Sequence, residues 1–262
     1  MTDDILVSTQ DRIATVTFNR PRQRNAISYH GWLELRRIAM DLDRDPEVRV
    51  VVFTGAGDAA FSAGADIKDF EDYRDNSEKA VVYAEAFDGA MDTIESMSKP
   101  TICLIKGFCV GGGCELSMAT DIRIAADNSR FGIPVARLSI LVGYKEMRRL
   151  VQLVGPGNAA YILLSARLID AQEAYRIGLV TQTVPLEEVS DVAYDLAREM
   201  VPLAPLSQAR HKEILQTVLK NPGLKSLSEE EELLPFTNFD SEDFQEGRSA
   251  FIERRTPTFQ GR

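Results

Sequence analysis

Uninterrupted apolar runs that end in glycine-rich loops place the strongest constraint on how this chain folds. Val48 to Phe53 is such a run and leads into Gly55-Ala-Gly57, as expected of a strand buried in a parallel sheet. Thr101 to Lys106 is a second run, and the glycines at Gly111 to Gly113 then open a helix. Asp121 to Ala126 returns as a strand, which completes a crossover unit. The repetition predicts an α/β fold with its loops gathered at one edge of a sheet.

Periodicity predicts the remaining elements. Ile13 to Asn19 alternates as a strand does, Ser28 is placed to cap a helix, and Ser77 to Met97 has the pattern of one long helix. The second half is mostly helical, with expected helices at 146–154, 158–164, 171–177 and 186–200 and a strand at 179–184. Three helical segments follow Pro205, with breaks at 221–223 and Pro235. This tail is rich in apolar and acidic residues, so we expect it to dock on a neighbour.

Charge and composition exclude several classes of function. Forty acidic residues against thirty basic ones leave a net charge of −10, which argues against general binding of nucleic acid or anionic membranes. Cys103, Cys109 and Cys114 form no CxxC pair, and His30 and His211 belong to no metal-binding motif. We therefore expect no metal site, and cysteines that fill core space. The chain shows no signal-peptide pattern and no apolar window of about eighteen residues, so we expect a cytoplasmic protein without a membrane span.

Two loops have the composition to carry chemistry. The first is residues 60–68, where small side chains allow a ligand to approach the main chain, and the second is residues 107–115, which leads into a helix. One backbone amide from each loop, converging on one point, forms an oxyanion hole. Glu115 then lies beside that point and is able to move a proton. Each signal also has a structural interpretation: the glycine triplet as a tight turn, Glu115 as a complement to the helix dipole, and Asp66 as a helix cap.

A rival motif covers residues 55–60, which fit a relaxed dinucleotide fingerprint, GxGxxA. That fingerprint requires a helix to begin within it, and Gly64 follows too soon for a helix to form. The motif also stands late in the chain. We therefore expect no nicotinamide site here.

In order along the chain, several motifs together resemble the crotonase superfamily, the enoyl-CoA hydratase/isomerase family. The strongest is Ala60-Phe-Ser-Ala-Gly-Ala-Asp-Ile-Lys68, which is similar to the family's first oxyanion-loop consensus. Gly111-Gly-Gly-Cys-Glu-Leu116, followed by Ala119 to Ala125, is similar to its second. Weaker landmarks are Asn19-Arg20-Pro21, Asn25-Ala26-Ile27, Phe131-Gly132 with Pro134, Gly178-Leu-Val180 before Val184-Pro185, Ser241 to Phe244, Gly247 and Phe251. The likeness covers nearly the whole chain.

The resemblance implies a crotonase-like spiral of ββα units with a C-terminal helical trimerisation segment. Residues 1–200 would form the spiral core that carries a CoA-thioester site, and residues 201–262 the helical segment. The family assembles as trimers that pair into hexamers, so a homotrimer or homohexamer is expected. The substrate would be an acyl-CoA thioester, and coenzyme A, as part of that substrate, leaves no separate cofactor to expect.

The resemblance also implies roles for particular residues. The amides of Ala65 and Gly112 match the oxyanion-hole positions that hold the thioester carbonyl, and Glu115 matches the first of two hydratase glutamates. Arg254 or Arg255, from this or a neighbouring subunit, would add to the contacts with the polyanionic coenzyme. The positions expected to contact substrate are Arg22, Arg24, Ala63, Asp66, Ile67, Lys68, Val135 and Phe251.

One departure from the family pattern leaves the chemistry open. The second glutamate should stand at residue 135, where this chain has valine, and the following loop reads Gly143-Tyr144-Lys145-Glu146-Met147. Glu115 alone would then serve as base and acid, or Tyr144 or Glu146 would replace the missing carboxylate, or the enzyme would carry out other chemistry on the same enolate. Burial beside an apolar side chain should raise the pKa of Glu115.

These observations favour an enoyl-CoA hydratase, a lyase that adds water to a 2-enoyl-CoA thioester. The alternatives are an enoyl-CoA isomerase of the same family and a non-catalytic acyl-CoA binder. The acyl chain and its pathway, such as fatty acid metabolism, stay open. Walls of its pocket are expected from residues 70–74, Phe87 and residues 135–142.

Overall fold

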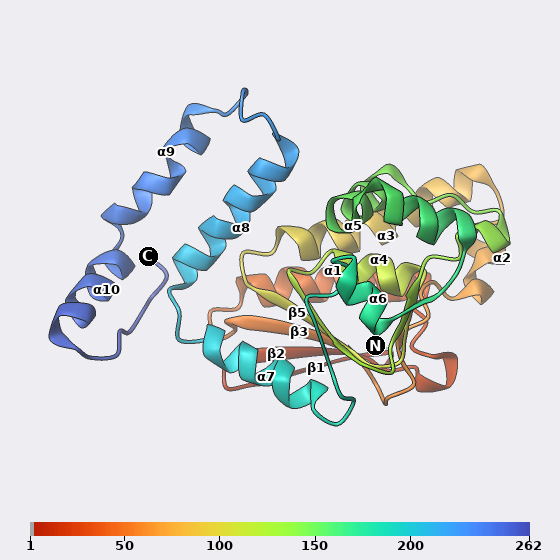
Figure 1. Cartoon of the computed structure of the whole chain (residues 1–262), viewed down its shortest axis with the longest axis horizontal. Helices are drawn as coiled ribbons and strands as arrows, with labels where there is room; N and C mark the ends of the chain where they lie inside the picture. The colour runs from red at the N-terminus through yellow and green to blue at the C-terminus, as the bar shows by residue number, and fades with distance from the viewer. Residues whose placement is uncertain (1–2) are drawn as a thin grey trace.

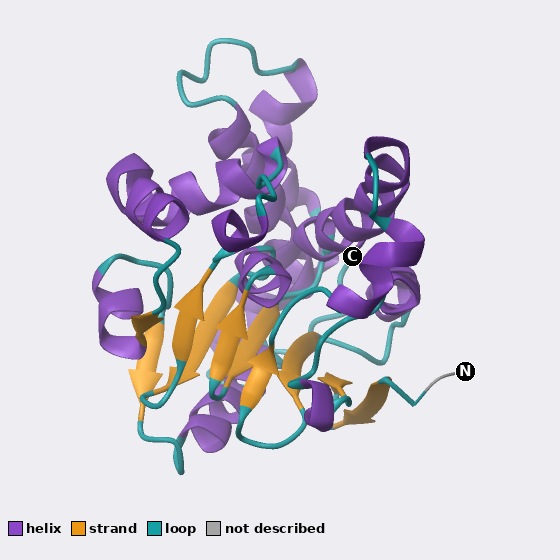
Figure 2. Ribbon diagram, turned by 90° about the vertical axis from the view of Figure 1, so that its right-hand side faces the viewer, coloured by secondary structure: helices purple, strands orange, loops and turns teal. Residues whose placement is uncertain are grey.

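A six-stranded sheet forms the base of the molecule in the computed structural model, which describes residues 3–262. Its spatial order is β1-β2-β3-β5-β7-β10, with β1 and β2 antiparallel and the other neighbours parallel. Figure 2 shows these strands side by side, with most helices gathered on one side of them. The strands are β1 (Ile5–Gln10), β2 (Ile13–Phe18), β3 (Val50–Gly55), β5 (Thr101–Ile105), β7 (Ile122–Ala126) and β10 (Gln182–Val184).

A second, four-stranded sheet is built from very short strands in the order β4-β6-β8-β9. They are β4 (Ala60–Ser62), β6 (Phe108–Val110), β8 (Arg130–Gly132) and β9 (Ile169–Asp170). Consecutive pairs β3–β4, β5–β6 and β7–β8 each give one strand to each sheet before the chain enters a helix. This repeat is the ββα spiral that the family resemblance implied, so the predicted α/β fold class is confirmed.

Seven helices accompany the described strands before residue 201. They are α1 (Tyr29–Arg44), α2 (Phe70–Tyr73), α3 (Ser77–Ser96), α4 (Gly112–Met118), α5 (Tyr144–Ser165), α6 (Ala171–Arg176) and α7 (Val189–Met200). Ser28 caps α1 as predicted, since its side chain accepts a hydrogen bond from the Gly31 amide. The apolar stripe of α1, including Trp32, Leu35 and Ile38, is buried in the main core with α3. The three cysteines are free and buried, as expected of core residues.

Two predicted helix breaks are wrong in detail. Residues 146–154 and 158–164 belong to one helix, α5, which bends at Gly155 (φ 74°, ψ 163°) without ending there. Pro235 lies inside α9 (Glu229–Thr237) instead of ending it. The chain does not form a dinucleotide turn after β3, because it passes directly into β4.

An arm of three helices extends from the core after residue 204. It consists of α8 (Pro205–Lys220), α9 and α10 (Glu242–Glu253), and Figure 1 shows it standing apart from the sheet and its helices. Several large apolar side chains on it are exposed, among them Leu215, Phe236 and Phe239. Within the described chain, no helix is both long and apolar enough to cross a membrane.

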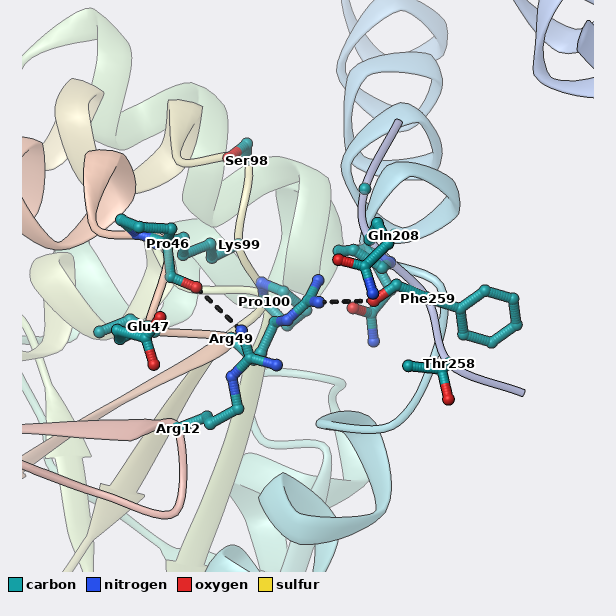
Figure 3. Close-up of a pocket in the computed structure, with 14 residues that line it drawn as sticks. Arg12, Pro46, Glu47, Arg49, Ser98, Lys99, Pro100, Gln208, Thr258 and Phe259 are labelled. Atoms are coloured by element: carbon teal, nitrogen blue, oxygen red, sulfur yellow. Dashed lines mark hydrogen bonds between the residues drawn. The ribbon is translucent and has the colours of Figure 1, made fainter. Parts of the chain in front are cut away.

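The C-terminal tail returns from the arm to the core, where residues 258–261 line a cavity of about 390 Å³ (Figure 3). Arg49 donates a hydrogen bond to the Phe259 carbonyl (3.0 Å), and Arg12 donates to the Pro46 carbonyl (2.9 Å). Lys99 also lines the cavity and donates to the Leu42 carbonyl at 2.6 Å. The arginines and the lysine thus tie backbone segments together where the tail meets the core.

Candidate active site

The first loop, residues 60–68, is held by a side chain from a distant part of the chain. Asn25 Nδ2 donates to the carbonyls of Ala56 (3.1 Å) and Ala60 (2.7 Å). Ser62 Oγ donates to the Asn25 carbonyl (2.8 Å) and accepts from the Gly64 amide (3.1 Å). All four bonds are buried or partly buried, so this network holds the loop in a single geometry.

Asp66 closes the same loop. Its carboxylate pairs with Arg20 (2.8 Å) and accepts from the Lys68 amide (3.1 Å), which caps a short 3-10 helix over Ile67–Asp69. The capping interpretation of Asp66 is therefore confirmed. Its oxygens are already engaged by the protein, so the structure gives it a role in holding the loop.

Backbone geometry brings the two loops together. Gly64 has φ +92°, and a Cβ placed on it would lie 2.6 Å from the Gly112 amide nitrogen. A Cβ on Gly112 would lie 3.3 Å from the Ala65 amide nitrogen. Gly112 is the first residue of α4, where a helix leaves its amides without internal acceptors. Within residues 3–262 neither the Ala65 nor the Gly112 amide donates to a protein acceptor. Two adjacent, unpaired amides are the donors that an oxyanion hole requires.

A cavity of about 300 Å³ opens beside these amides. The predicted wall segments do line it, including Phe70, Phe87, Val135 and Val142. Ala63, Ala65, Ile67 and Gly112 from the two loops line it as well. Its surface is mainly apolar, which suits an acyl chain next to a polar reacting group.

Glu115 lies in the wall of this cavity and is 6% exposed. Burial, followed by the nearby charge of Glu146, raises the pKa of Glu115 to about 8, whereas the charge of Arg74 acts in the opposite sense. The predicted direction of this pKa shift is confirmed. A carboxyl with a pKa near 8 is suited to give and take a proton close to neutral pH.

Glu146 is the second buried carboxyl of the cavity wall. It pairs with Arg149 (3.2 Å), which is itself held by Asp92 and Glu95 of α3, each at 2.7 Å. Burial raises the pKa of Glu146. Tyr144, the other candidate for the missing glutamate, is 97% exposed and does not reach the cavity. It occupies the first turn of α5 on the side away from the core.

Comparisons with known proteins agree with this geometry. The family model described as enoyl-CoA hydratase/isomerase matches residues 8–262. The chain belongs to this family. It is 35% identical to a crotonyl-CoA hydratase from Syntrophomonas wolfei, and the match covers 98% of each chain. It is 34% identical to a short-chain-enoyl-CoA hydratase from Clostridium acetobutylicum, and that match covers 97% of this chain and 96% of the relative. A crystal structure of an enoyl-CoA hydratase/carnithine racemase from Magnetospirillum magneticum superposes with a TM-score of 0.95 at 34% identity. The superposition covers 100% of this chain and 97% of that one.

The basic residues that the family resemblance assigned to coenzyme A lie outside the cavity wall. Arg22, Arg24 and Lys68 are all exposed, and Arg24 lies over the Phe108 ring at 5.0 Å. Their exposure leaves them free to meet a polyanion, and their role stays a prediction.

Phe251 does not close the cavity of its own chain. It is 85% exposed on α10, within the arm that Figure 1 shows apart from the core. The prediction fails within a single chain because the arm extends away from the enoyl-CoA hydratase/isomerase core. A contact with the site of a second copy stays a prediction.

Arg74 lines the cavity, within the wall segment predicted at residues 70–74, whereas sequence reasoning did not single out two other polar residues of the wall, Tyr83 and Asp88. Tyr83 is buried on α3, and its hydroxyl accepts a hydrogen bond from Trp32 Nε1 (2.9 Å). Burial raises the pKa of Tyr83 to about 12, so the phenol stays neutral. Asp88 lies 3.8 Å from Lys145 across the α3–α5 contact. The sequence did place residues 83, 87 and 88 close together on one helix. That spacing does not indicate which other elements their side chains contact.

Proposed function

We propose that this protein is an enoyl-CoA hydratase, a lyase that adds water across the double bond of a 2-enoyl-CoA thioester. The proposal rests on the buried carboxyl of Glu115 in the same cavity wall as the free amides of Ala65 and Gly112. Relatives named crotonyl-CoA hydratase and short-chain-enoyl-CoA hydratase, alike over nearly the whole chain, support it.

In the proposed reaction, the two amides bind the thioester carbonyl oxygen. As water attacks C3, the C2–C3 π electrons move toward that oxygen, and the amides stabilise the resulting enolate. Ionised Glu115 takes a proton from the attacking water and then returns a proton to C2 as the enolate collapses. Water thus gives OH to C3 and H to C2, and the carboxylate is regenerated. No cofactor beyond the coenzyme A of the substrate is needed.

Glu146 takes the place of the family's second glutamate in this proposal. Its ion pair with Arg149 keeps a fixed charge close to Glu115, and a water molecule that binds between two carboxyls is oriented for attack. Val135, at the position where that glutamate was expected, forms apolar wall instead.

The test is incubation with crotonyl-CoA, following loss of the enoyl-thioester absorbance and the mass of the product. We expect a gain of one water, and a fall of kcat by roughly 10²- to 10⁴-fold in Glu115→Gln, the range for loss of a general acid–base group. A product of unchanged mass, with the double bond moved, would instead establish the isomerase alternative. Binding without turnover would establish the non-catalytic alternative.

We also propose that the chain assembles as a homotrimer or homohexamer in the cytoplasm. The exposed apolar side chains of the arm, such as Phe236 and Phe239, support contact with another copy. Phe251 and Arg254 of one copy would then lie near the site of its neighbour. Three free, buried cysteines support a reducing compartment.

A further inference from the structure

Arg74 lines the cavity without an ion-pair partner among the described residues. Asp88 faces Lys145 (3.8 Å) and Glu146 faces Arg149 (3.2 Å), so each of those acids is matched by a base. Within residues 3–262, the guanidinium of Arg74 makes no ion pair and no side-chain hydrogen bond. Its charge acts on Glu115 without a direct ion pair, so its N–H donors stay unused beside a mainly apolar cavity.

Aromatic rings hold this guanidinium in place. Its central carbon lies 5.2 Å from the Phe70 ring centre and 5.0 Å from the Tyr83 ring centre. Cation–π contacts of this kind fix the position of an arginine while leaving its five N–H donors free. Phe70, Arg74 and Tyr83 all line the cavity, so the free donors border the space that receives the acyl chain.

We propose that Arg74 forms an anion subsite for the acyl chain, and that the preferred substrate is a 2-enoyl-CoA with a carboxylate at the far end of that chain. This inference rests on the proposed hydratase function. A carboxylate accepts two parallel N–H bonds from a guanidinium, a geometry that neither a methyl group nor lysine reproduces. An unsubstituted short chain would leave the guanidinium without an acceptor, and sites with unpaired polar groups discriminate against such ligands.

Binding of saturated thioesters tests the subsite without requiring turnover. Calorimetry would compare butyryl-CoA with glutaryl-CoA and adipoyl-CoA, whose longer chains end in a carboxylate. We expect the wild-type protein to bind at least one of the carboxylate esters about tenfold more tightly than butyryl-CoA. Arg74→Gln should abolish that preference, and Arg74→Lys should restore part of it. Lys79→Gln, which removes a nearby cation outside the cavity wall, should keep it.

Two outcomes would overturn the proposal. One is equal binding of all three esters by the wild-type protein. The other is an equal loss of affinity for all three in Arg74→Gln, which would mean that Arg74 contacts coenzyme A instead of the acyl chain. Melting curves of the variants would establish that they are folded. If the binding preference holds but the matching 2-enoyl esters are not hydrated, the proposed function fails and the subsite stands.

Discussion

At the scale of single residues, the cavity controls protonation through burial and neighbouring charge. Glu115 has lost most of its contact with water, and the charge of Glu146 further disfavours its ionised form. Arg149 keeps Glu146 in place through a buried ion pair that extends to Asp92 and Glu95. The proton-transfer properties of Glu115 therefore depend on α5 and α3 as much as on its own helix.

The pH dependence of catalysis should report this coupling. Because the proposed mechanism needs ionised Glu115 and its pKa is about 8, kcat/KM should rise with pH up to about 8 and then level off. Glu146→Gln removes a negative charge that favours the protonated form, so the pKa of Glu115 should fall and the rise should move to lower pH. Kinetics from pH 5.5 to 9.5 with crotonyl-CoA would measure both profiles. Glu230→Gln, on the exposed face of α9, is the control, and identical profiles for all three proteins would refute the coupling.

At the scale of elements, the site depends on how closely the loop after β4 approaches the start of α4. The approach is possible because neither Gly64 nor Gly112 has a side chain in the gap between the loops. The Asn25 and Ser62 hydrogen bonds then keep the first loop from moving away.

A pair of glycine substitutions separates loop contact from backbone strain. Gly57 and Gly64 both have positive φ, but a Cβ on Gly57 meets nothing within 4 Å, whereas one on Gly64 lies 2.6 Å from the Gly112 amide. Gly57→Ala should lower the free energy of unfolding by about 1 kcal/mol and leave kcat/KM unchanged. Gly64→Ala should destabilise more and lower kcat/KM at least tenfold, since it displaces an oxyanion-hole donor. Denaturant unfolding and steady-state kinetics measure the two effects, and equal kinetics in the two variants would contradict the role given to this contact.

At the scale of the whole molecule, the arm is the part that packs least against the rest of its own chain. Its helices carry exposed apolar side chains and stand apart from the core, while the tail beyond α10 returns to Arg49 (Figures 1 and 3). An arm of this kind is stabilised when another copy covers its apolar face.

Light scattering after size-exclusion chromatography tests the assembly. We expect a mass of three or six times 29.1 kDa. Phe236→Asp places a charge on an exposed apolar position of α9 and should lower that mass, because burying the carboxylate in a contact is unfavourable. A monomeric wild-type protein at micromolar concentration would contradict the proposed trimer or hexamer.

Local patterns in the sequence were enough to locate five of the six strands of the larger sheet, all but β1, together with most helices, the two loops and Glu115. Buried runs and helical stripes depend on neighbours within a few residues, so periodicity reveals them. Strands β4, β6 and β8 were missed because each has three residues and exists through pairing with distant parts of the chain. Gly155 and Pro235 were misjudged because packing tolerates a bend and a proline that local preference disfavours.

The sequence by itself determined the family, the fold class and the positions whose amides and carboxyl are able to carry the chemistry. The tertiary structure decided which residues share the cavity. Glu146 enters it and Tyr144 does not, because two positions along α5 turn the side chain to the opposite face. Arg74, just after α2, was expected in the wall, but its position over the Phe70 and Tyr83 rings comes from the packing of this segment against α3. These placements depend on how separate helices pack against one another, which is information that spacing along the chain does not contain.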